Sequence, residues 1–136
     1  MSIRFVFALA IAASAAAASG PAVRASNAGY TGGGYADFGD VPGQSIEWSA
    51  AIAETRDYVL EFRYANGGGT NRPLNVKVDP GTPGGTSNAL AFAPTGSWTT
   101  WRTVSVTVRL PAGQHRIRLD SLGVGPNVDA LTIRPA

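Results

Sequence analysis

Apolar and polar residues alternate with a period of two in six separate stretches of the chain. The stretches cover residues 46–49, 58–65, 74–79, 104–110, 116–120 and 131–133. Successive side chains of a β-strand point to opposite faces, so each stretch predicts a strand with one apolar and one polar face. The clearest is Val104 to Leu110, where apolar residues alternate with Ser105, Thr107 and Arg109. This pattern is typical of antiparallel sheets that cover a core on one side and meet water on the other.

The segments between these stretches are rich in turn-forming residues. Glycine and proline punctuate residues 65–71, 79–85, 110–114 and 123–127, and the chain has 17 Gly and 9 Pro in all. Only 15% of the residues are charged, which argues against long exposed helices. One weakly helical stretch, 49–57, is short and has no stop signal. We therefore predict an all-β domain, either a β-sandwich or a barrel.

The first 18 residues differ in composition from the rest. Residues 1–4 form a short basic segment, and residues 5–18 are apolar and rich in alanine. That length suits the hydrophobic part of a signal peptide and falls short of the roughly 20 residues that a membrane span needs. We predict a signal peptide over 1–18, with an alternative cleavage after residue 25, and a mature domain over 19–136 without a membrane span. The protein is then secreted or periplasmic; an uncleaved N-terminal anchor is the alternative.

The composition argues against several functional classes. The chain has no Cys, which removes thiolate metal sites and cysteine nucleophiles. Its net charge is +2 with scattered arginines, so no basic stripe for nucleic acid is present. A glycosidase needs two carboxylates at a set separation, and Asp37 and Asp40 on one loop are a weak pair. The only histidine, His115, has no nucleophile-elbow motif to act with. We predict a protein that is not an enzyme.

Two tryptophans lie three residues apart in the polar turn 95–101, just before a predicted strand. So large an apolar surface is usually covered, which favours one indole facing the core and the other facing outward. We assign Trp101 to the core, together with Trp48 in its apolar stretch. Trp98 is then a platform for a flat, weakly polar ligand such as a sugar ring; burial in the core is the alternative.

Six motifs in order give the chain a family resemblance. They occupy residues 33–38, 45–48, 58–67, 95–101, 108–119 and 125–131. Over about residues 22–136 the sequence resembles the non-catalytic carbohydrate-binding modules of families 35 and 6, with family 35 the closer. The resemblance implies a jelly-roll β-sandwich of two antiparallel sheets, with a sugar site in the loops at one end. The expected partner is a polysaccharide or oligosaccharide, and we expect a monomer.

The resemblance also implies site residues. The family's Tyr, Trp and Asn fall on Tyr35, Trp98 and Asn127, and Asn66 lies in a loop that lines the same site in family 35. The rings would stack on the sugar and the amides would hydrogen-bond its hydroxyls, since an amide both donates and accepts. Other roles remain open: Tyr35 as a half-buried strand end, and the two asparagines as turn formers. If the sugar is acidic, Arg72 or Arg102 could pair with it.

The beginning of the chain departs from the family pattern. Family members open with a strand that carries Glu-Ala-Glu, whose carboxylates help to bind a structural calcium. Here the first glutamate is Glu47, so Asp129, which matches the family's C-terminal calcium ligand, lacks its two partners. We expect a sandwich without its usual first strand, and Asp129 as a calcium ligand or a loop-bracing carboxylate; a plain surface acid is the alternative. A structural or adhesion sandwich that has lost sugar binding is the alternative function.

Overall fold

The structure, a computed structural model, describes residues 3–6 and 21–136. These residues form β-strands joined by loops. The strands are β1 (Ile3–Val6), β2 (Ala22–Arg24), β3 (Tyr35–Asp37), β4 (Ser45–Ile52), β5 (Arg56–Ala65), β6 (Leu74–Val78), β7 (Thr86–Leu90), β8 (Arg102–Leu110), β9 (Gly113–Ser121) and β10 (Asn127–Pro135).

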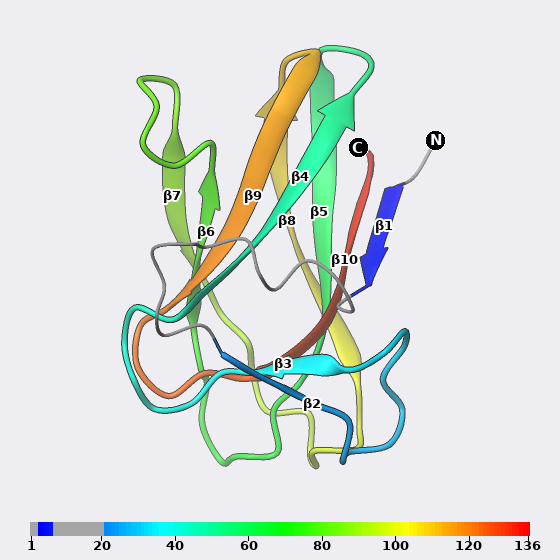
Figure 1. Cartoon of the computed structure of the whole chain (residues 1–136), viewed down its shortest axis with the longest axis vertical. Coiled ribbons are helices and arrows are strands. Elements are labelled where there is room, and N and C mark those ends of the chain that lie inside the picture. Colours follow the sequence, from blue (N-terminus) through cyan, green and yellow to red (C-terminus); the bar gives the residue numbers. More distant parts are fainter. Residues whose placement is uncertain (1–2, 7–20) are drawn as a thin grey trace.

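Two antiparallel sheets face each other and make up the domain (Figure 1). One has the order β2-β3-β10-β5-β8, with β1 also paired to β10; the other has the order β4-β9-β6-β7. Strand β10 pairs with β5 over its whole length, while its first two residues also pair with β3. The predicted all-β sandwich of two antiparallel sheets is confirmed.

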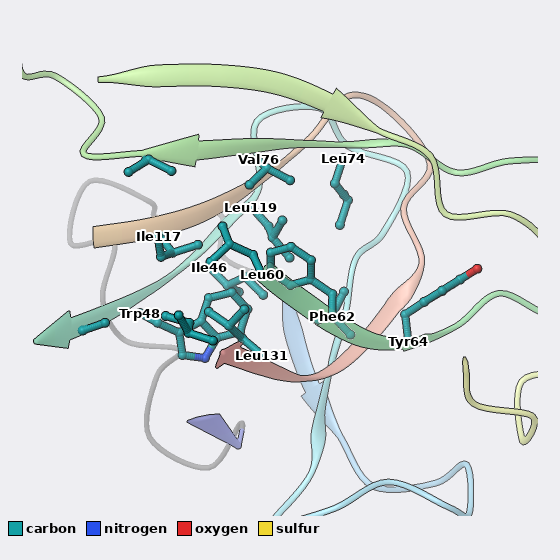
Figure 2. Packing of buried hydrophobic residues seen from close by; sticks show 14 of the residues in the cluster. Ile46, Trp48, Leu60, Phe62, Tyr64, Leu74, Val76, Ile117, Leu119 and Leu131 are labelled. Carbon is teal, nitrogen blue, oxygen red and sulfur yellow. The ribbon is translucent and has the colours of Figure 1, made fainter. Parts of the chain in front are cut away.

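The core lies between the two sheets and consists of the apolar residues of the alternating stretches (Figure 2). Ile46, Leu60 and Ile117 are fully buried, and Trp48 is 2% exposed with its ring near that of Phe62. The predicted inward faces of these strands and the core position of Trp48 are therefore confirmed. Each of these residues contributes roughly 1.5–3 kcal/mol by leaving water.

The structure differs from the predicted strands in several places. The weakly helical stretch 49–57 is instead the end of β4, a turn and the start of β5. Strand β7 was not predicted because Thr86–Leu90 is an exposed sheet edge without apolar alternation. Strands β2 and β3 have only three residues each, too few for a period to appear.

Most of the predicted signal peptide lies outside the described residues. Its residues Ile3–Val6 are described and form β1, in register with residues 130–133 of β10. A strand therefore lies beside β10 in a sandwich that we predicted to lack its first strand; unpaired backbone along β10 would be an open sheet edge. Cleavage after residue 25 would remove β2 as well as β1.

Candidate functional site

A shallow hollow lies among the loops at one end of the sandwich. It measures about 250 Å³ and is lined by Asn27, Asp37, Arg72, Trp98 and Asn127. Asn27 precedes β3 and Asp37 ends it, Arg72 lies between β5 and β6, Trp98 lies between β7 and β8, and Asn127 begins β10. In Figure 1 these connections converge at the end of the molecule that β2 and β3 cross. The fold thus brings five distant segments to one site.

Asn127 is the most deeply placed polar side chain of the hollow. It is 3% exposed, and strand pairing sets it opposite Asp37 of β3 and Ala65 of β5. Its buried Oδ1 has no hydrogen-bond partner among the described residues. Leaving a buried acceptor unsatisfied costs about 1–3 kcal/mol. Asn127 therefore contributes an amide to the wall of the hollow, and its Oδ1 is closed off from solvent.

Trp98 and Arg72 form a stacked pair beside Asn127. The guanidinium carbon of Arg72 lies 4.9 Å from the centre of the Trp98 ring, and its Nη1 donates to the carbonyl of Gly125 at 3.2 Å. Trp98 is partly exposed, as a ligand platform must be. The backbone of Gly67 lies against the indole so closely that an added Cβ would be 2.4 Å from its Cδ1. The Gly loop after β5 therefore sets the position of the ring.

Asn66 does not line the hollow, and its sugar contact stays a prediction. The residue is fully buried, and its Nδ2 donates to the carbonyls of Thr70 and Phe92, each at 2.9 Å. Its Oδ1 accepts from the amide of Gly68 at 3.0 Å. Both amide hydrogens are used within the fold, which agrees with the alternative role as a turn former. Asn66 shapes the loop that carries Gly67 and leads to Arg72.

Tyr35 is also buried and does not line the hollow, and its stacking on a sugar stays a prediction. It has no exposed surface, and its ring packs against Tyr30 and Trp101 at centroid distances of 5.7 and 5.3 Å. Its hydroxyl lies 3.2 Å from Ser26 Oγ and accepts from the amide of Asn27 at 3.2 Å. Loop residues cover the ring that a sugar would need. Tyr35 instead positions Asn27, which does line the hollow.

Asp129 is fully buried on β10 among hydrogen-bond donors. Thr31 donates to it from its amide at 2.8 Å and from its hydroxyl at 2.9 Å, and Arg63 Nη1 lies 2.8 Å from Oδ2. Calcium needs six to eight oxygen ligands with several carboxylates. The described residues hold no cluster of three acidic or imidazole side chains that could bind a metal, and a guanidinium already faces Asp129. The donors around Asp129 do not fit calcium; they fit the alternative of a loop-bracing carboxylate.

Asp129, Thr31 and Arg63 together form a brace, and Arg63 also connects it to Gly29 in the loop before β3. Its Nη1 also donates to the carbonyl of Gly29 at 2.7 Å, and its guanidinium lies 5.5 Å from the centre of the Trp101 ring. Trp101 is half-buried and not a full core residue, and its Nε1 donates to Ala28 at 2.9 Å. Gly29 has φ +105°, and a Cβ there would lie 2.6 Å from Trp101, so no other residue fits easily. The cluster fixes residues 28–31 against β5 and β10.

Three lining residues were not assigned to the site from the sequence. Arg72 was named only as a cation for an acidic sugar, and nothing in its neighbourhood placed it beside Trp98. Asp37 was weighed only as half of a glycosidase pair; it accepts from Arg24 Nε at 2.7 Å. Asn27 belongs to an irregular loop, for which periodicity carries no signal. These three residues share a position at the same end of the sandwich, and that position becomes known only when the pairing of the strands is known.

The domain is thus a two-sheet β-sandwich whose loop end carries an indole, an amide and a guanidinium around a shallow hollow. The model of the carbohydrate binding module (family 6) matches residues 12–134. The chain belongs to this family and is a non-catalytic module. The described part of the chain contains no helix long and apolar enough to cross a membrane.

Known proteins share both sequence and fold with the chain. It is 38% identical over 114 residues to an exo-beta-D-glucosaminidase of Amycolatopsis orientalis, covering 82% of this chain and 11% of that enzyme. A family 35 module from Clostridium thermocellum has a TM-score of 0.78 at 31% identity, over 99% of this chain and 92% of that one. Xyl-CBM35, solved in complex with a glucuronic acid-containing disaccharide, has a TM-score of 0.76 at 29% identity, over 83% of this chain and 81% of that one. The match to the enzyme is thus confined to a small part of its length.

Proposed function

We propose that the module binds a glycan in the hollow between Asn27, Asp37, Arg72, Trp98 and Asn127. Trp98 supplies apolar surface for the C–H face of a sugar, and Asn127 and Arg72 supply hydrogen bonds to its polar groups. The observation that carries the proposal is the convergence of Trp98, Arg72 and Asn127 on one hollow, which sets an apolar ring beside groups that can hydrogen-bond sugar hydroxyls.

We further propose that the bound sugar is acidic. Arg72 brings a permanent positive charge to the hollow, with no carboxylate partner among the described residues, whereas the charge of Asp37 is met by Arg24 at 2.7 Å. A guanidinium matches a carboxylate in geometry and charge. The glucuronic acid in the complex of Xyl-CBM35 supports the same class of ligand. Residues 1–18 favour export, which N-terminal sequencing of the protein from periplasm or medium would test.

A glycan array that contains neutral and uronic acid-bearing oligosaccharides tests this proposal. We expect signals on the acidic glycans, unchanged by a calcium chelator because no calcium site fits around Asp129. Arg72→Gln should weaken binding to the acidic glycans by about tenfold, the range expected when a charged hydrogen bond is lost. Arg102→Gln, an exposed arginine outside the hollow, is the matched control. A folded protein that binds no glycan would favour the structural or adhesion role instead.

Gly67→Ala is expected to weaken glycan binding without a change at any ligand-contacting residue. The new methyl would lie 2.4 Å from Trp98 Cδ1, so the indole has to move. A shift of the platform should cost about tenfold in affinity, or about 1.4 kcal/mol. Gly69→Ala is the control in the same loop, because nothing lies within 4 Å of its added Cβ. Equal affinities of the two variants in calorimetry would show that the placement of the indole by Gly67 does not matter.

A further inference from the structure

A second hollow adjoins the first at the same end of the sandwich. It measures about 360 Å³, and its walls include Thr70, Asn71, Arg72, Pro73, Leu122 and Val124. Arg72 is common to both hollows. We propose that this second hollow is a subsite for the next sugar residue of the same glycan chain. The inference rests on the proposed function of the first hollow and extends it from one sugar to at least two.

Arg72 lines both hollows, and two contacts hold its side chain in place. Its guanidinium lies over the Trp98 ring, 4.9 Å from the centre. Its Nη1 donates to the carbonyl of Gly125, the residue that follows Val124. Its main-chain amide donates to the carbonyl of Phe92 at 3.2 Å. A ligand that leaves the first hollow over Arg72 therefore meets residues 122–124 next.

The loop that carries Leu122 and Val124 is anchored at both ends. Ser121 donates from its amide to the carbonyl of Gln44 and from its hydroxyl to Val41, each at 2.8 Å. The amide of Gly125 donates to Gly39 at 3.1 Å, and an added Cβ on Gly125 would lie 2.4 Å from Phe38 Cβ. The two apolar side chains are thus presented by a backbone that the fold holds in place, so little ordering cost falls on binding.

The chemistry of the second hollow suits a sugar. Leu122 and Val124 are 46% and 47% exposed and rank among the few large apolar side chains exposed in the described part of the chain. They offer apolar surface to C–H groups. The Oδ1 of Asn71 accepts a hydrogen bond from the main-chain amide of Phe92 at 2.8 Å. The Nδ2 of Asn71 has no partner among the described residues and can donate to a sugar hydroxyl. Thr70, also exposed, adds a hydroxyl.

The size of the patch favours a glycan over a protein partner. A stable protein interface covers about 800 Å² on each side, which a hollow with two exposed apolar side chains does not approach. Arg72, the one charged residue among its walls, already serves the first hollow. A sugar linked to the one beside Trp98 needs only a small, mixed apolar and polar surface, because the first sugar holds it there.

Calorimetry with glucuronic acid and with a glucuronic acid-containing disaccharide tests the subsite. The wild-type protein should bind the disaccharide about tenfold more tightly than the monosaccharide. The double variant Leu122→Ser/Val124→Ser should lose about fivefold to tenfold of the disaccharide affinity and keep its monosaccharide affinity. Val23→Ser, which changes a valine 50% exposed outside both hollows, should alter neither.

The outcomes separate the subsite from the site itself. Equal wild-type affinities for the two sugars, or a double variant that binds the disaccharide as the wild type does, would overturn the subsite and leave the first hollow intact. Loss of monosaccharide affinity in the double variant would also overturn it, since Leu122 and Val124 would then belong to the first hollow. A wild-type protein that binds neither sugar would overturn both proposals. Melting temperatures of all variants establish that they are folded.

Discussion

Trp98→Ala is expected to weaken glycan binding by about thirtyfold while the protein stays folded. Trp98 is partly exposed, lines the hollow, lies beside Gly67 and Arg72, and is not among the buried residues of the core. Aromatic anchors of this kind carry 2 kcal/mol or more of a binding energy, which is about thirtyfold in affinity. The free energy of unfolding should fall by only about 1 kcal/mol, as for an ordinary partly exposed site. Calorimetric titration and urea denaturation measure the two effects.

Trp48→Ala is the control for this result. Trp48 is 2% exposed between the sheets and packs near Phe62, as Figure 2 shows. Its removal should cost about 3–5 kcal/mol of stability. If Trp98→Ala unfolds the protein as Trp48→Ala should, Trp98 is a core residue. If Trp98→Ala keeps its affinity for the glycan, the sugar lies elsewhere.

Arg63→Gln is expected to lower the free energy of unfolding by about 3 kcal/mol. The substitution leaves the carboxylate of Asp129 without its guanidinium at a position with no exposed surface. Removing one partner of a buried pair costs about 3–5 kcal/mol because the other charge stays buried. Thr31 continues to donate two hydrogen bonds, which puts the expected loss at the lower end of that range. Urea denaturation measures it directly.

Arg109→Gln is the matched control, in a pair between the same sheet's strands β5 and β8. Arg109 lies 3.4 Å from Asp57, and both side chains are more than half exposed. Such surface pairs contribute about 0–1 kcal/mol. The double variant Arg63→Gln/Asp129→Asn should recover part of the loss, because no charge is then left buried. Equal, small effects of Arg63→Gln and Arg109→Gln would contradict the brace, as would a wild-type stability that rises with added calcium.

The inward faces of the long strands could be predicted because burial repeats along the chain. Leu60 and Phe62 on β5, and Ile117 and Leu119 on β9, alternate with polar residues, and all four are fully buried. Such a pattern is set by the pleat of a single strand and needs no knowledge of its neighbours. The edge strand β7 and the short β2 are almost entirely exposed, and β3, although two of its three residues are buried, is too short to show a period.

The site could be predicted only in part, because the burial of a side chain under a loop leaves no periodic pattern in the sequence. Trp98 and Asn127 were named and both line the hollow. Tyr35 has the residue type of a sugar platform, yet Tyr30 and Trp101 cover its ring, and that depends on the path of the loop before β3. Arg72 enters the site because Gly68 lets its guanidinium pass close to the backbone, at 2.7 Å from an added Cβ. These are contacts between segments distant in sequence.

Nuclear magnetic resonance of the nitrogen-labelled protein, titrated with the acidic oligosaccharide that it binds, tests the central claim most directly. The account predicts that the indole N–H of Trp98 and the side-chain amide of Asn127 shift as the hollow fills, while the buried indole of Trp48 does not. Saturable binding that leaves the Trp98 and Asn127 signals in place would contradict it, and the residues that do shift would mark the true site.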